Sequence, residues 1–130
     1  MIDSTNSPVT EGEKLSVNAT VTNTGGKQGT QTVMLNAGAL GTDSTGVTLN
    51  ASESATVSLS VQTNSGEAGN YSTTVSSQND SDSMSVTVLS EANFSVDLTE
   101  TNAPIVEGDQ LSLTANVTNT GAVQDTQTVT

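Results

Sequence analysis

Residues 11–33 read EGEKLSVNATVTNTGGKQGTQTV, and residues 107–129 read EGDQLSLTANVTNTGAVQDTQTV. The two stretches start at positions 11 and 107, so the text recurs at a spacing of 96 residues. Within each stretch apolar residues alternate with Ser, Thr and Asn, which is the period-two pattern of a strand with one buried face. A fixed spacing close to the length of one small β domain predicts a tandem repeat.

The alternation continues along the chain, and helical periodicity appears nowhere. We therefore predict an all-β fold, a two-sheet antiparallel sandwich, with strands at residues 15–21, 33–37, 55–61, 71–75, 84–88 and 94–98. Between residues 40 and 49 the glycines Gly41 and Gly46 interrupt the pattern, which predicts an irregular edge. The side chains that we expect to face the core are Leu15, Val17, Val21, Val33, Leu35, Val57, Leu59, Tyr71, Val75 and Val86.

Two domains follow from the repeat. Residues 1–90 form the first repeat, and residues 91–130 form the first part of a second repeat, with strands A and B and the start of strand C. At the spacing of 96, Leu98 corresponds to Ile2, while Phe94 and Val96 have no counterpart, so the first repeat lacks the apolar start of its strand A. The chain is therefore expected to be a fragment or a processed subunit.

The segment Glu67-Ala68-Gly69-Asn70-Tyr71 indicates the type of sandwich. An acidic residue, a glycine and a tyrosine in this spacing at the start of a strand resemble the tyrosine corner of immunoglobulin-like sandwiches, in which the phenol bonds back to nearby backbone. The chain contains no cysteine. The resemblance therefore implies an immunoglobulin-like sandwich without the inter-sheet disulfide of antibody domains.

Several turn and core motifs point in the same direction. They are Pro8-Val9-Thr10-Glu11-Gly12-Glu13, Val21-Thr22-Asn23-Thr24-Gly25, Gly69-Asn70-Tyr71 and Val86-Thr87-Val88. Together they resemble the CARDB-type (cell-adhesion-related) immunoglobulin-like repeats that are common in surface and secreted proteins of haloarchaea. The resemblance implies an extracellular or cell-surface location and the role of a stalk, adhesin or filament module.

The net charge is −12, with 14 acidic side chains, two basic side chains and no histidine. No basic surface exists to neutralise phosphates, which excludes a nucleic-acid-binding protein and disfavours docking on anionic membranes. No segment reaches the ~20 apolar residues of a membrane span, so we expect no direct membrane insertion. The charge fits a salt-adapted protein; a merely acidic surface protein from low salt is the alternative.

Catalysis needs a positioned base or nucleophile, and the chain has no His, Cys or Arg to supply one. We therefore expect that it is not an enzyme and that it binds no organic cofactor. Asp80 and Asp82 could give oxygen ligands to Ca²⁺, but they supply few of the six to eight that this ion prefers, so a solvated turn is the stronger interpretation. Glu11 or Glu91 could complete such a calcium site.

Six Asn-x-Ser/Thr sequons are candidate N-glycosylation sites. They are Asn18, Asn50, Asn70, Asn79, Asn93 and Asn116. Asn18 lies between the core positions Val17 and Ala19, so its side chain is expected to face solvent, and Asn116 is placed alike in the second copy.

These observations favour a structural module of an extracellular filament, pilus-like fibre or surface stalk. Its expected partners are other copies of itself or adjacent repeats, joined by strand complementation in which Phe94, Val96 and Leu98 fill the strand that the first repeat lacks. The alternative is an adhesin module that binds protein or carbohydrate. An adhesin needs a spare aromatic residue or a clustered loop site, and Tyr71 and Phe94 already have structural roles.

If the charge is an adaptation to brine, the thermal midpoint should climb steadily between about 0.1 and about 2 M NaCl or KCl, because salt screens repulsion and favours burial. Thermal melts followed by circular dichroism measure this. Ca²⁺ at about millimolar concentration should add little beyond its ionic strength. A midpoint that stays flat or falls would remove the salt-adapted interpretation.

Overall fold

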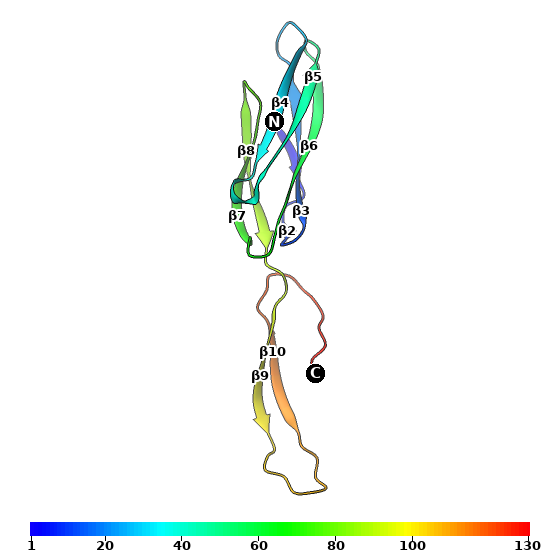
Figure 1. Ribbon diagram of the computed structural model, residues 1–130, viewed down its shortest axis with the longest axis vertical. Helices are drawn as coiled ribbons and strands as arrows, with labels where there is room; N and C mark the ends of the chain where they lie inside the picture. Colours follow the sequence, from blue (N-terminus) through cyan, green and yellow to red (C-terminus); the bar gives the residue numbers. More distant parts are fainter. The chain divides into compact units, whose positions relative to one another are not determined.

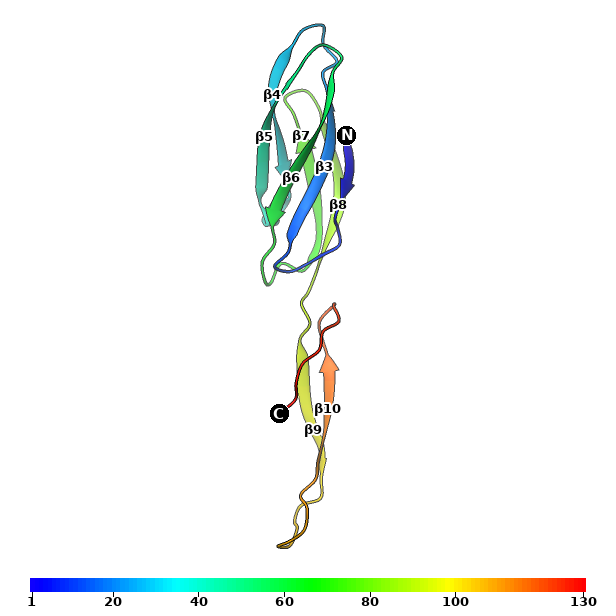
Figure 2. The same cartoon turned by 90° about the vertical axis from the view of Figure 1, so that its right-hand side faces the viewer.

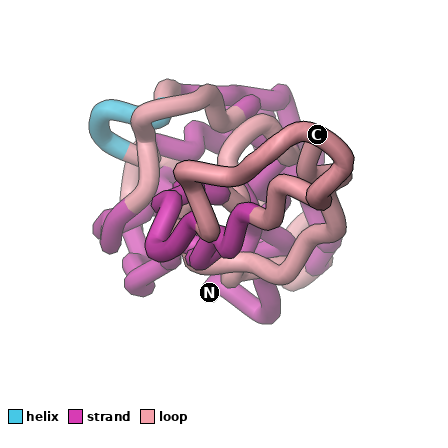
Figure 3. Tube along the Cα trace, turned by 90° about the horizontal axis from the view of Figure 1, so that it is seen from below, coloured by secondary structure: helices cyan, strands magenta, loops and turns pink.

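The computed structural model describes residues 1–130, which form two compact units, Met1–Ser90 and Glu91–Thr130. The chain folds into ten strands and a single turn of 3-10 helix, η1 (Gly38–Leu40), with no α-helix. In Figure 3 the strands are magenta and the helical turn is cyan. The prediction of an all-β chain is confirmed.

The first unit contains two sheets, which Figures 1 and 2 show as two layers. The three-stranded sheet has the order β1 (Ile2–Thr5), β3 (Lys14–Thr22), β6 (Ser54–Gln62). The five-stranded sheet has the order β2 (Val9–Thr10), β8 (Ser81–Leu89), β7 (Gly69–Ser76), β4 (Gly29–Asn36), β5 (Thr42–Leu49). All pairings are antiparallel except that of β2 with β8.

The core lies between the two sheets and consists of the inward residues of both. Along β3 the side chains of Leu15, Val17 and Ala19 are buried, while those between them are half-buried. The opposite sheet contributes Val33 and Leu35 of β4, among others, to the same cluster. This arrangement is consistent with a β-sandwich. Every residue that the alternation placed inward is either buried in this cluster or packed against it.

The start of the chain differs from the single strand A that the pattern suggested. β1 pairs with β3 in one sheet, and after the cis Ser7–Pro8 peptide β2 pairs in parallel with β8 in the other sheet. At the crossing, the Asn6 side chain accepts from the Ser16 N–H at 2.8 Å and donates to the Lys14 carbonyl at 2.9 Å. These side-chain bonds take the place of ladder bonds where the backbone changes sheets.

Residues 40–49 also differ from expectation, because β5 is a regular strand that pairs with β4 from Asn36–Thr42 to Gly29–Leu49. The glycine that disturbs the backbone is Gly41, whose φ of 121° lies in the turn before the strand. Gly46 lies inside the strand and faces open space. The main-chain ladder holds this edge strand, so it needs few apolar side chains and gives a weak pattern.

The second unit is a hairpin of β9 (Phe94–Thr101) and β10 (Leu113–Asn119). Its register matches that of β1 with β3: Leu98 lies opposite Ala115 as Ile2 lies opposite Ala19, and both ladders shift register just after this pair. Residues 120–130 form no strand. The expected start of a third strand is not formed, because β4, its counterpart, is held by β5 and β7, which residues 91–130 do not contain.

The apolar face of this hairpin is exposed. Leu111 is 53% exposed, whereas Leu15, its counterpart 96 positions earlier, is 0% exposed. The same contrast separates Leu113 at 60% from Val17 at 0%. Nearly identical strand sequences are thus core in one unit and surface in the other, because only the first unit has a second sheet to cover them.

This contrast predicts the effect of a matched pair of substitutions. Leu15→Ala should lower the free energy of unfolding of the first unit by about 2–5 kcal/mol, because it leaves a cavity in the core. Leu111→Ala should change that free energy by less than about 0.5 kcal/mol, because its side chain is already in water. Urea unfolding followed by the Tyr71 signal measures both. Equal losses in the two variants would contradict the assigned burial.

Candidate functional site

The phenol of Tyr71 forms the bond that the tyrosine-corner motif predicted. Its hydroxyl donates to the Glu67 carbonyl at 2.7 Å, four residues earlier and just before β7. The turn that carries this carbonyl is held by Glu11, whose Oε1 accepts from the Gly66 and Ala68 N–H groups at 2.9 and 2.8 Å. Tyr71 and Glu11 are therefore committed to fixing the end of the sandwich.

Three turns use a glutamate in the same way. The Glu13, Glu53 and Glu67 carboxylates each accept the backbone N–H of the residue three positions earlier, at 2.8, 2.7 and 2.7 Å. The sequence analysis treated these side chains as surface charge. The signal that could have identified their role is the spacing, a Thr or Asn followed three residues later by Glu at a turn.

Asp80 and Asp82, the weak calcium candidates, lie just before and within the start of β8. Asp82 Oδ2 accepts from the Ile2 N–H at 2.8 Å, and its Oδ1 accepts from the Ser83 N–H at 2.9 Å. These backbone hydrogen bonds, the one from Ile2 first, lower the pKa of the Asp82 carboxyl below its ordinary value of 3.8. No group of three or more His, Cys, Asp or Glu side chains comes together around them. Calcium binding stays a prediction.

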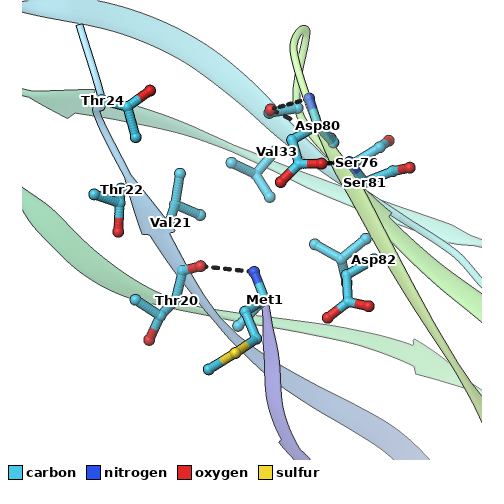
Figure 4. A pocket seen from close by; sticks show the side chains of 13 residues that line it. Met1, Thr20, Val21, Thr22, Thr24, Val33, Ser76, Asp80, Ser81 and Asp82 are labelled. Atoms are coloured by element: carbon cyan, nitrogen blue, oxygen red, sulfur yellow. Dashed lines mark hydrogen bonds between the residues drawn. The ribbon is translucent and has the colours of Figure 1, made fainter.

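Both aspartates line a groove at the end of the first unit where β3 extends beyond β1. The groove has a volume of about 370 Å³, and a second hollow of about 490 Å³ adjoins it. Figure 4 shows Val21 and Val33 in the groove, with Asp80 and Asp82 carried by the strand on its other side. We call this the open groove; its lining residues used below are Met1, Thr20, Val21, Thr22, Thr24, Val33, Val75, Asp80 and Asp82.

The six sequons lie on different elements. Asn18 is half-buried in β3, and its Nδ2 donates to Ser4 Oγ at 3.3 Å, so this amide is engaged. The other five asparagines, Asn50, Asn70, Asn79, Asn93 and Asn116, are exposed, and their amide nitrogens donate no hydrogen bond. The expectation that Asn18 faces open solvent was therefore too simple, because β1 covers part of this face.

Phe94, Val96 and Leu98 lie on one side of β9, opposite Asn119, Val117 and Ala115 of β10. Val96 is 55% and Leu98 is 66% exposed, while Phe94 is half-buried. The apolar side chains proposed for contacts between copies are thus presented on a paired strand that nothing else in its unit covers.

The sequence was compared with protein-family models and with curated proteins, and none of them matches it. The structure contains no helix of the length and apolar character needed to cross a lipid bilayer.

The lowered pKa of Asp82 predicts a pH-dependent contribution to stability. The folded state favours the ionised carboxyl, so this contribution is present above about pH 3.8 and is lost as the pH falls through the lower folded pKa. Asp82→Asn keeps an oxygen acceptor for the Ile2 N–H but cannot ionise. The gap in unfolding free energy between wild type and this variant should therefore narrow on acidification. Urea unfolding at about pH 6, 4 and 2.5 measures it, and a constant gap would disprove the role.

Proposed function

We propose that the chain is a structural module of an extracellular filament or cell-surface stalk, assembled from immunoglobulin-like repeats that resemble the CARDB type. The observation that carries this proposal is the pair of strands β3 and β10, which share one sequence pattern but are buried in one unit and exposed in the other. A strand whose apolar face is uncovered needs a further sheet from a neighbouring repeat or copy.

The repeat reading rests on hydrogen bonds that recur at the spacing of 96. Asn102 bridges Gln110 and Ser112 at 2.8 and 2.8 Å, just as Asn6 bridges Lys14 and Ser16. Asn119 closes its turn by bonds to Val123 and Gly121 at 2.8 and 2.9 Å, the bonds that Asn23 makes to Lys27 and Gly25. Equivalent asparagines thus hold equivalent turns, which supports a second copy of the same fold.

The immunoglobulin-like reading rests on topology and on one side chain. The first strand is divided between both sheets, the order of the larger sheet places β8 next to β7 and β7 next to β4, and Tyr71 bonds back to the backbone at the start of β7. This combination is typical of immunoglobulin-like sandwiches, whose F strand carries the tyrosine corner between strands G and C.

The extracellular and salt-adapted parts of the proposal rest on composition. A charge of −12 keeps such modules soluble at high ionic strength, and the five sequons with free amide nitrogens offer sites for glycans in a host that attaches them. Assembly then joins copies through β9, whose apolar residues Phe94, Val96 and Leu98 add to the sandwich of a neighbour.

Assembly through β9 predicts a concentration-dependent increase in mass that needs its apolar side. Phe94→Asp should shift the chain toward monomer, because a charge would enter the contact, whereas Ser95→Asp should leave assembly intact, because Ser95 points to the opposite side of the strand. Light scattering after size exclusion in about 2 M salt, with electron microscopy, measures this. Wild-type chain that stays monomeric up to about millimolar concentration would contradict the filament role.

A further inference from the structure

The pairing of β3 on its β1 side ends at Thr20, although β3 continues. Met1 N donates to the Thr20 carbonyl at 3.0 Å, and the Thr20 N–H donates to the Met1 carbonyl at 2.9 Å. In an antiparallel ladder every second residue presents both its N–H and its C=O to the same edge. Thr22 therefore presents its backbone groups to an edge where no strand pairs with it, at the mouth of the open groove.

The second unit contains the same five residues with a partner in place. Residues 117–121 repeat residues 21–25, Val-Thr-Asn-Thr-Gly. There Thr118 pairs with Ser95, and Thr120 donates from N and Oγ1 to the Asn93 carbonyl at 2.7 and 3.0 Å. Thr24, the counterpart of Thr120, makes no such bond. The edge formed by residues 21–25 thus has the same donors and acceptors as an edge that binds an extended segment.

Gly25 gives an independent indication of the same ligand. In the second unit the backbone of Glu91 and Ala92 passes so close to Gly121 that a Cβ there would collide with the Glu91 carbonyl. Gly25 occupies the equivalent position, yet its backbone is not left-handed and only the Asn23 Oδ1 lies near the place of a Cβ, at 3.2 Å. Neither backbone conformation nor its own unit explains a glycine here, whereas a passing segment does.

The chemistry of the groove specifies which side chains the segment carries. A residue opposite Val21 points to the same face as Val21, between Val33 and Val75. In β9 this position is Val96, opposite Val117, and the next residue on the same side is Phe94. The groove therefore fits an extended segment with apolar side chains at alternate positions.

We infer that the open groove is an acceptor site for residues 91–96 of a second copy of this chain, an inference that rests on the filament role proposed above. The following residues, 97–101, have the register of residues 1–5, so the incoming strand replaces β1 along β3. The exchange is favourable because Val96, 55% exposed against β10, would meet Val33 and Val75 of a second sheet when it pairs with β3.

The test is a titration of the isotope-labelled full chain with a synthetic peptide of residues 90–101. We expect saturable NMR shifts at Val21, Thr22 and Thr24. A peptide with Phe94→Asp should bind at least about tenfold more weakly, while one with Ser95→Asp should bind like the native peptide. No shifts at this edge, or equal binding of the Phe94→Asp peptide, would overturn the inference.

Two variants of the chain sharpen the test. Gly25→Ala should weaken peptide binding by about tenfold with the thermal midpoint of the free chain little changed, while Gly26→Ala, which faces open space, should bind normally. A chain with residues 91–96 copied directly ahead of Met1 should melt at a higher temperature and bind no peptide. If that chain is stabilised while the native chain binds no peptide, the groove takes only a segment joined to its own β1, and the second copy is excluded.

The failure of this inference and that of the filament role can be told apart. Peptide binding by a chain that never assembles leaves the acceptor site in place and removes the filament. Assembly that persists in the Gly25→Ala chain, with no peptide binding, keeps the filament and places its contact elsewhere.

Discussion

Burial of an apolar sheet face requires a second sheet, and most of this molecule follows from that constraint. A strand supplies one row of apolar side chains, and main-chain pairing alone leaves that row in water. In the first unit β4, β7 and β8 cover the row of β3, so its leucine and valines are buried. In the second unit the same ladder and the same turns form, but the row stays exposed.

Carboxylates do more in this fold than keep it soluble. With two basic side chains in the whole chain, the acidic groups find their partners among backbone N–H groups instead. Glu11 holds the turn below Tyr71, Glu13 and Glu53 hold their own turns, and Asp82 holds the first strand beside β8. Each bond satisfies an N–H that a turn leaves unpaired, so part of the negative charge is a structural component.

The sequence predicted the elements with strong alternation and missed those held by the main chain alone. The strands β3, β6 and β7 and their inward residues were predictable, because period-two burial leaves a clear pattern. β5 was not, because an edge strand with a Thr-rich, Gly-containing stretch needs few apolar residues. Of the candidate site, Phe94 and Val96 were predictable from the repeat. The groove was not, because it depends on where the pairing of β1 stops and on a glycine whose significance appears only beside Gly121.

The near-identity of β3 and β10 also affects how the chain reaches its native state. β6 pairs with β3 from Leu15–Val61 to Val21–Ala55, and β10 offers Val117, Ala115 and Leu113 in the same order. During folding two strands of one chain therefore compete for a single edge, and only one of them leads to the first repeat. Tandem repeats with such similar strands are prone to misassembly by exchange between neighbours. The differences between the copies, such as Val17 against Leu113, are then the features that let the chain distinguish its own strands.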